Sequence, residues 1–101
     1  MNIDLSGEVA LVTGSSRGIG KAIAESLGKA GATVAVHCRE SMERAEELAE
    51  KIGNNSSVFR ADLEDRKQVL SLFAEVLDRY GKVDLLVNNA GIFEHAPVEK
   101  D

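Results

Sequence analysis

The sequence predicts an α/β fold in which parallel strands form a doubly wound sheet. Short apolar runs that end at glycine or at polar residues alternate with longer segments whose apolar residues recur every three or four positions. A fourth short apolar run follows the last of the longer segments. Such a pattern indicates parallel strands joined by right-handed helical crossovers, in the order β-α-β-α-β-α-β.

The first unit is a strand over residues 9–13, followed by a helix that starts at a glycine-rich turn. The strand sequence, Val-Ala-Leu-Val-Thr, is continuously apolar, which is typical of a strand buried on both faces. Apolar residues at helical spacing define the expected buried face of the helix: Ile19, Ala22, Ile23, Leu27 and Ala30. Gly31 is expected to end this helix in the left-handed conformation.

The second unit begins with the apolar, β-branched run at residues 33–38. Ser41 can cap the helix that follows, because a serine side chain accepts a hydrogen bond from the free amides of a first helical turn. The expected core face of this helix contains Ala45, Leu48, Ala49 and Ile52. We expect Gly53 to end it.

The third unit combines a weaker strand at residues 57–61 with a helix that starts at Asp65. Asp65 and Gln68 form a start similar to a capping box, with aspartate in place of the usual serine or threonine. The core face is expected to contain Val69, Leu72, Phe73, Val76 and Tyr80. Gly81 ends the helix, and residues 83–87 form the fourth strand. The expected strand order, 3-2-1-4, puts this strand at an edge, through which the isolated chain is expected to self-associate.

Composition excludes several classes of protein. The chain has 101 residues, a net charge of −5 and one cysteine, Cys38, so at most one domain and no internal disulfide are expected. The sequence has no block of lysine or arginine residues, so we do not expect a nucleic-acid partner. No apolar run approaches the roughly 18 residues of a membrane span, and the N-terminus lacks the pattern of a secretory signal. Cytoplasm is therefore the expected location.

A glycine-rich turn follows the first strand, at the end of a parallel sheet where ligands bind. Gly14, Gly18 and Gly20 give the spacing Gly-x-x-x-Gly-x-Gly. Glycines let backbone amides approach a pyrophosphate, and the N-terminus of the following helix attracts the anion. The position between a strand and a helix is the context that a dinucleotide site requires, with a bare structural turn as the alternative.

The end of the second strand bears on the choice of cofactor. NAD-binding proteins usually place an acidic residue here for the ribose, whereas NADP-binding proteins place an arginine near the 2′-phosphate. Cys38 is uncharged, Arg39 follows it, and Arg17 in the glycine turn could reach the same phosphate. The sequence therefore favours NADP over NAD. The alternative is that both arginines are simply solvated.

Polar residues also follow the third and fourth strands. Asp62, followed by Leu63, could accept a hydrogen bond from an adenine amino group, or form an ordinary turn. The segment Asn88-Asn-Ala-Gly91 could join strand ends through its amides and leave room for a flat ligand, or simply end the strand. His37 alternates within its strand and is expected to be structural.

Taken together, Thr-Gly-x-x-x-Gly-Ile-Gly, Asp-Leu and Asn-Asn-Ala-Gly resemble the short-chain dehydrogenase/reductase family over nearly all of residues 5–95. The resemblance implies a Rossmann fold, a nicotinamide cofactor and hydride transfer between an alcohol and a carbonyl. The cofactor contacts that it implies are Gly14, Ser16, Arg17, Gly18, Ile19, Gly20, Arg39, Asp62, Leu63, Asn89, Ala90 and Gly91. The sequence is also similar to bacterial 3-oxoacyl-acyl-carrier-protein reductases, whose substrates are 3-oxoacyl thioesters.

The resemblance also implies a role for each group of residues. Ser16, Arg17 and Arg39 would hold the 2′-phosphate, and Asp62 would bind adenine with Leu63 beside it. Residues 89–91 would border the ribose next to the nicotinamide. Asn88 would instead join neighbouring strands.

The catalytic pair of the family, Tyr-x-x-x-Lys, has no match in this sequence. The one tyrosine, Tyr80, is followed four residues later by Asp84, and it continues the apolar face of its helix. No catalytic residue and no metal ligand is therefore assigned. Residues 1–101 are expected to be the N-terminal part of a single Rossmann domain, without the catalytic part. The parent protein is expected to be a homo-oligomer that acts on a small carbonyl or alcohol.

Two other classes of protein compete with this interpretation. The chain could be a catalytically inactive nucleotide-binding or interaction fragment, as the missing Tyr-x-x-x-Lys pair suggests. An S-adenosylmethionine methyltransferase also uses a strand, a glycine turn and a helix. That class would usually have an acidic residue in place of Cys38.

Overall fold

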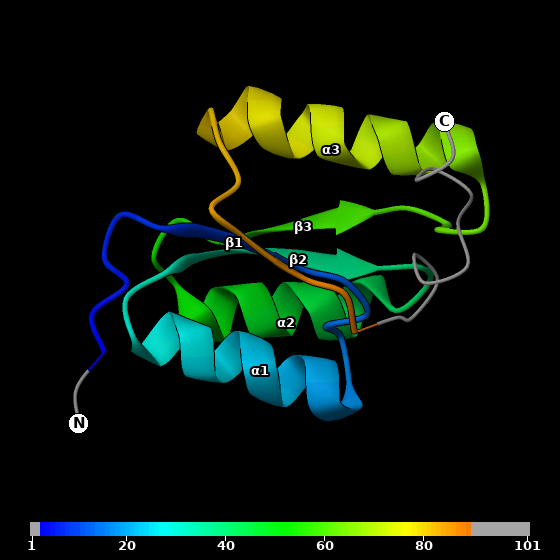
Figure 1. Ribbon diagram of the computed structural model, residues 1–101. Coiled ribbons are helices and arrows are strands. Elements are labelled where there is room, and N and C mark those ends of the chain that lie inside the picture. The colour runs from blue at the N-terminus through cyan, green and yellow to red at the C-terminus, as the bar shows by residue number, and fades with distance from the viewer. Residues whose placement is uncertain (1–2, 90–101) are drawn as a thin grey trace.

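A parallel sheet of four strands divides the structure into two helical layers (Figure 1). The computed structural model describes residues 3–89. Its elements are β1 (Val9–Val12), α1 (Gly18–Lys29), β2 (Thr33–Cys38), α2 (Met42–Ile52), β3 (Ser57–Arg60), α3 (Arg66–Tyr80) and β4 (Leu85–Val87). The strand order is β3-β2-β1-β4, which confirms the predicted order. Helices α1 and α2 cover one face of the sheet, and α3 covers the other (Figure 1).

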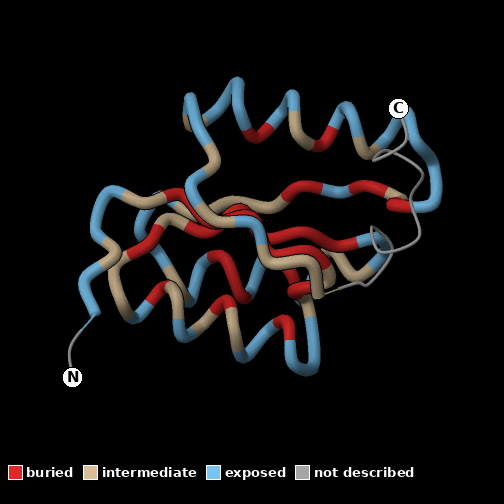
Figure 2. Tube along the Cα trace, viewed as in Figure 1, coloured by how far each residue is buried: buried red, intermediate tan, exposed pale blue. Residues whose placement is uncertain are grey.

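Alternation of side chains along the strands builds a separate core on each face of the sheet. In β1, Val12 packs with the residues under α1 and α2, whereas Leu11 packs with those under α3. All four residues of β1 are buried, as expected for a strand covered on both faces (Figure 2). On the α3 side, Leu72 and Val76 are fully buried, which confirms the face predicted for this helix.

Strand β4 is shorter than the predicted segment 83–87, because Asp84 bonds to β1 in a different way. The Val9 amide donates to Asp84 Oδ2 over 2.8 Å, and the Asp84 amide donates to the Val9 carbonyl over 2.8 Å. The hydrogen bonds that the Asp84 carboxylate accepts from the Val9 amide and from the Lys82 side chain lower the pKa of this carboxyl. Regular pairing therefore starts at Leu85, opposite Ala10.

Helix α1 buries a different face from the one predicted. Ile19 is 72 % exposed and Ala22 is also exposed, whereas the buried residues are Gly20, Ala24 and Gly28. The spacing of four is right, but the buried face is shifted by one residue. Small residues allow the helix to approach its neighbours closely, and half-buried Ile23 and Leu27 pack beside them.

Both ends of α3 and the C-terminal end of α2 agree with the sequence, with Gly81 and Gly53 in the C-cap positions, but the N-terminal end of α2 does not agree. Asp65 Oδ1 accepts from the Lys67 amide over 3.0 Å and caps α3. Gln68 departs from a capping box: its Nε2 donates to Asp65 Oδ2 over 3.1 Å, and its Oε1 accepts from the Asp62 amide over 2.8 Å. Ser41 does precede α2, but its side chain makes no capping hydrogen bond, so that prediction is wrong.

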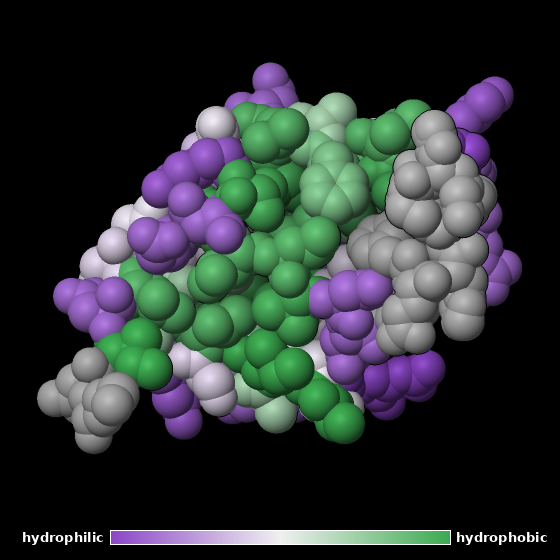
Figure 3. Space-filling model, viewed as in Figure 1, coloured by the Kyte–Doolittle hydropathy of each residue, from purple (hydrophilic) through white to green (hydrophobic). Residues whose placement is uncertain are grey.

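An apolar surface lies over the β4 edge of the sheet (Figure 3). Leu86 on β4 is 48 % exposed, and Leu70 and Leu77 on α3 are also exposed. Among residues 3–89, strand β4 pairs with β1 on one side only, so within this range no strand pairs with the backbone donors and acceptors of its other side. Within residues 3–89, no helix has both the length and the apolar character that crossing a membrane requires.

We predict that the isolated 101-residue chain self-associates through the β4 edge. An apolar edge strand with unpaired amides and carbonyls templates pairing with another copy. Light scattering over a concentration series should show a mass that rises with concentration, and Leu86→Lys should suppress the rise. Ile19→Lys is the matched control, since Ile19 is exposed on α1, which covers the other face of the sheet. A monomer at every concentration would contradict the prediction.

Candidate functional site

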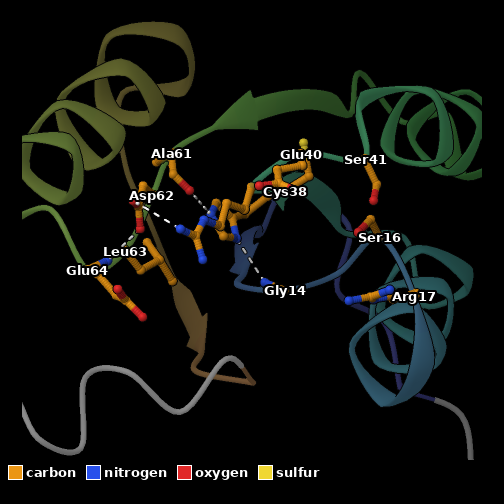
Figure 4. A pocket seen from close by; sticks show the side chains of 12 residues that line it. Gly14, Ser16, Arg17, Cys38, Glu40, Ser41, Ala61, Asp62, Leu63 and Glu64 are labelled. Atoms are coloured by element: carbon orange, nitrogen blue, oxygen red, sulfur yellow. Dashed lines mark hydrogen bonds and ion pairs between the residues drawn. The ribbon is translucent and has the colours of Figure 1, made fainter.

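A cavity of about 340 Å³ opens at the carboxyl ends of β1, β2 and β3 (Figure 4). Its walls are the glycine turn after β1, residues 39–41 after β2, and residues 61–64 after β3. Predicted cofactor residues that line it are Gly14, Ser16, Arg17, Arg39, Asp62 and Leu63. Of the others, Gly18, Ile19 and Gly20 form the first turn of α1, Asn89 follows β4, and Ala90 and Gly91 lie outside the described residues. The topology therefore brings most of the predicted residues to one end of the sheet.

The glycine turn leaves the N-terminus of α1 open to a ligand. Gly14 and Gly18 adopt φ values of +63° and +65°, a left-handed conformation that glycine reaches at little cost. Arg17 occupies the N-cap position, and its side chain makes no capping hydrogen bond. The first amides of a helix have no partner within the helix, so this end of α1 can bind an anion such as a pyrophosphate.

Gly20 has no room for a side chain, because α1 touches the turn and the end of β4 at this residue. An ideal Cβ on Gly20 would lie 2.4 Å from the Gly14 carbonyl oxygen and 2.6 Å from Asn89 Nδ2. Asn89 Nδ2 also donates to the Gly14 carbonyl over 3.2 Å. Asn88 Oδ1 accepts from the Thr13 hydroxyl over 3.4 Å. Both asparagines therefore join the end of β4 to the end of β1.

An ion pair joins two walls of the cavity, the segment after β2 and the segment after β3. Arg39 lies 3.5 Å from Asp62 Oδ2, while Asp62 Oδ1 accepts from the Glu64 amide over 3.0 Å. The Arg39 side chain is 58 % exposed, and an exposed pair of this kind contributes little stability. Arg17 and Asp62 lie on opposite sides of the cavity (Figure 4), so the two arginines do not converge here.

A second cavity adjoins the first between α1 and α2 and shares Ser16 and Arg17 with it. Its volume is about 360 Å³, and its lining includes the basic residues Lys21, Arg44 and Lys51. Lys51 is paired with Glu25 over 3.1 Å. Arg17 thus stands between two cavities and beside further positive charge.

Comparison with known proteins places the chain in a family. The family model described as short chain dehydrogenase matches residues 8–101. The chain belongs to the short-chain dehydrogenase family. This family uses nicotinamide cofactors, which agrees with an open helix N-terminus beside a cavity at the strand ends. The family and the observed topology also confirm the predicted Rossmann-type fold.

Several family members are similar to this chain. The sorbitol dehydrogenase of Cereibacter sphaeroides is 43 % identical over 94 residues, which cover 93 % of this chain and 36 % of that protein. A dehydrogenase/reductase of Sinorhizobium meliloti 1021 superposes with a TM-score of 0.83 at 38 % identity, over 87 % of this chain and 36 % of the other. Landomycin C-6 ketoreductase LanV, solved with bound NADP and rabelomycin, is 44 % identical with a TM-score of 0.75, over 89 % and 40 %. The chain thus spans between 36 % and 40 % of the length of these relatives.

Six residues that the sequence did not assign to the cofactor site also line the cavity: His37, Cys38, Glu40, Ser41, Ala61 and Glu64. The His37 ring is buried and bonds to both neighbouring loops, in agreement with a structural role. Burial raises the pKa of the Cys38 thiol, whose Sγ lies 3.4 Å from Met42 Sδ, so the thiol stays protonated at neutral pH. Ser41, free of the capping role, presents its hydroxyl at the cavity. The alternation of residues along the strand predicts which face of the sheet His37 lies on, but it does not predict the loop residues to which the ring bonds.

We predict that Gly20→Ala distorts the glycine turn. The added methyl group would meet the Gly14 carbonyl, a backbone atom that moves only if the turn moves. Overpacking of this kind costs about 1–3 kcal/mol of folding stability, and nucleotide affinity should fall with it. Urea denaturation and cofactor titration measure the two effects.

Gly7→Ala is the control for that substitution. Gly7 has a φ of +87° and an open environment, so alanine introduces backbone strain of about 1–2 kcal/mol without a clash. Its cofactor affinity should stay unchanged. Equal affinities for the two variants would contradict the close-approach role of Gly20.

Proposed function

We propose that the chain is the nucleotide-binding part of an NADP-dependent oxidoreductase, which transfers a hydride between nicotinamide and a carbonyl or alcohol. The observation that carries the proposal is the charge at the cavity. Arg17 and Arg39 line it, and the residue that ends β2 is the uncharged Cys38. An acidic residue at that position would repel a 2′-phosphate and bind a ribose hydroxyl instead. The NADP bound to LanV, a relative of similar fold, supports the same choice.

The residues present fit such a cofactor at three places. The uncapped N-terminus of α1 can receive the pyrophosphate, because Gly20 keeps the backbone free of a side chain there. Arg39 offers a guanidinium group to the 2′-phosphate, and Ser16 and Ser41 add hydroxyls to the same cavity. Arg17 lies on the opposite side of the cavity and would have to turn to reach this phosphate. Leu63 offers an apolar surface to adenine. The nicotinamide supplies or accepts the hydride when the cofactor is bound.

Asp62 and Arg39 have to exchange partners when the nucleotide binds. The carboxylate would turn from the guanidinium to the adenine amino group, and the guanidinium would turn to the phosphate. Both side chains are accessible, at 32 % and 58 %, so the ion pair that they lose is weak. Charge-assisted bonds to a phosphate are stronger, so the exchange favours the bound state.

We propose a chemical class of substrates and no single compound. Relatives of this chain are named for sorbitol, hydroxynaphthalene and versicolorin, which are chemically diverse alcohols and carbonyls. We propose a small carbonyl or alcohol, and we include 3-oxoacyl thioesters in the panel because of the resemblance to 3-oxoacyl-acyl-carrier-protein reductases. The nucleotide contacts that we propose for this reaction come from residues 14–91.

We predict that Arg39→Ala in the whole protein weakens NADPH binding selectively. A charge-assisted hydrogen bond contributes about 1.5–3 kcal/mol, which corresponds to a loss of roughly 10- to 150-fold. NADH lacks the 2′-phosphate, so its affinity should hardly change. Fluorescence titration of both cofactors measures the ratio.

Arg66→Ala is the control for Arg39→Ala, because Arg66 is exposed at the start of α3 and does not line the cavity. It should leave both affinities unchanged. Equal losses of NADPH and NADH on Arg39→Ala would contradict the role of Arg39 at the phosphate.

The alternative, an inactive nucleotide-binding fragment, makes a separate prediction for the 101 residues alone. Tyr80 lies outside the residues that line the cavity, and its hydroxyl donates to the Asn55 carbonyl over 2.8 Å and bonds to Ser57. It is therefore engaged in packing rather than in catalysis. We expect no turnover of NADPH with a panel of carbonyls. Turnover that survives Tyr80→Phe and exceeds a heat-inactivated control would show that another residue is catalytic.

A further inference from the structure

The His37 imidazole joins the two loops that form opposite walls of the nucleotide cavity. The ring is 3 % exposed and lies at the end of β2. The Gly14 amide of the glycine turn lies 2.9 Å from Nδ1, and the Ala61 carbonyl after β3 lies 2.9 Å from Nε2. One side chain therefore links the pyrophosphate end of the site to the adenine end.

The backbone of His37 holds the same turn through Ser15. The Ser15 amide donates to the His37 carbonyl over 3.1 Å, and the Ser15 hydroxyl donates to that carbonyl over 3.2 Å. The His37 amide in turn donates to Ser15 Oγ over 2.9 Å. The Ser15 contacts are independent of the ring, so the turn keeps part of its attachment whatever the state of the imidazole.

The two partners of the ring determine its protonation. An amide can only donate and a carbonyl can only accept, so Nδ1 has to be unprotonated and Nε2 has to carry the hydrogen. This is a neutral imidazole in a single tautomer. A second proton would go to Nδ1 and would face the Gly14 N–H, which places two donors against each other. The Gly14 hydrogen bond would then be lost.

The surroundings of the ring favour the neutral state. Burial lowers the pKa of His37 below its ordinary value of 6.5, and the hydrogen bond to Ala61 opposes this in part. Charged residues that share the cavity, or that begin the helix on this face of the sheet, are Arg17, Arg39, Glu40, Asp62, Glu64, Asp65, Arg66 and Lys67. They combine both signs of charge. Burial, rather than one charged neighbour, therefore sets the direction of the shift.

We propose that neutral His37 is a positioning residue for the cofactor, which holds the glycine turn and the end of β3 at the separation that the nucleotide needs. The inference rests on the proposed function. The ring occupies the Gly14 amide, so the amides of the α1 N-terminus are the ones left for the pyrophosphate. Protonation of the ring breaks its hydrogen bond to the Gly14 amide, which loosens the turn and weakens nucleotide binding. The ring acts through Gly14 and Ala61 and does not act on the hydride.

The test compares the whole wild-type protein with His37→Asn and His37→Phe by NADPH titration from pH 8 to pH 5. Asparagine can accept from the Gly14 amide and does not titrate, whereas phenylalanine fills the space without bonding to either loop. The 2′-phosphate of NADPH itself titrates near pH 6, so the effect of the ring is the difference between wild type and His37→Asn.

We expect the wild type to lose about 10-fold more affinity than His37→Asn as the pH falls through the pKa of the ring, which burial holds below 6.5. His37→Phe should bind about 10-fold more weakly than wild type at pH 8, and on acidification it should lose no more affinity than His37→Asn. Thermal melts identify any variant that fails to fold. The ¹⁵N shifts of the wild-type ring give an independent readout, because Nδ1 should be unprotonated at pH 8.

Identical pH profiles for wild type and His37→Asn, or a protonated Nδ1 at pH 8, would overturn the inference. Failure of the proposed function looks different: the wild type at pH 8 would prefer NADH over NADPH. The same pH comparison, made with NADH, would then decide the role of His37. Binding of neither cofactor would contradict both.

Discussion

The attachment of the Gly14 peptide groups on two sides is the interaction on which the site depends. The Gly14 amide donates to the His37 ring at the end of β2, and the Gly14 carbonyl accepts from Asn89 after β4. Gly20 then approaches the same carbonyl too closely for a side chain. Parallel strands end at a common edge, so three separate segments meet at one residue. A position held in this way can offer the α1 N-terminus to an anion without reorganisation.

The Arg39–Asp62 side of the site is held more weakly than the turn at Gly14, and this difference suits a binding site. The Arg39–Asp62 pair lies at the exposed end of the cavity, where water screens it and where its loss costs little. Half-buried hydrogen bonds thus hold the glycine turn, whereas accessible charges remain able to change partner. Selectivity for a phosphate can therefore reside in Arg39 without any cost to the fold.

The two faces of the sheet differ in how completely they are covered. Helices α1 and α2 pack side by side on one face through small residues, with Gly28 against Ile52. On the other face α3 leaves Leu77 and Leu86 exposed over the edge strand. The chain spans little more than a third of the length of its relatives, so the association that we predict concerns the isolated chain alone.

Local sequence patterns determined the elements, their order and the end of the sheet that carries the site. Periodicity of apolar residues identifies strands and helices, and the right-handed crossover rule leaves few strand orders to consider. The glycine turn could be placed because strand, turn and helix adjoin in the chain.

Only the tertiary structure decided which face α1 buries, how Ser41 is used and what His37 and Arg39 bond. Ile19 looks like a core residue by spacing, yet Gly20, Ala24 and Gly28 lie inward, because close packing selects small residues where a helix meets a sheet. The partners of His37 are more than 20 residues away in the chain. No local pattern carries information about contacts of that separation, which arise only when parallel strands bring distant loops together.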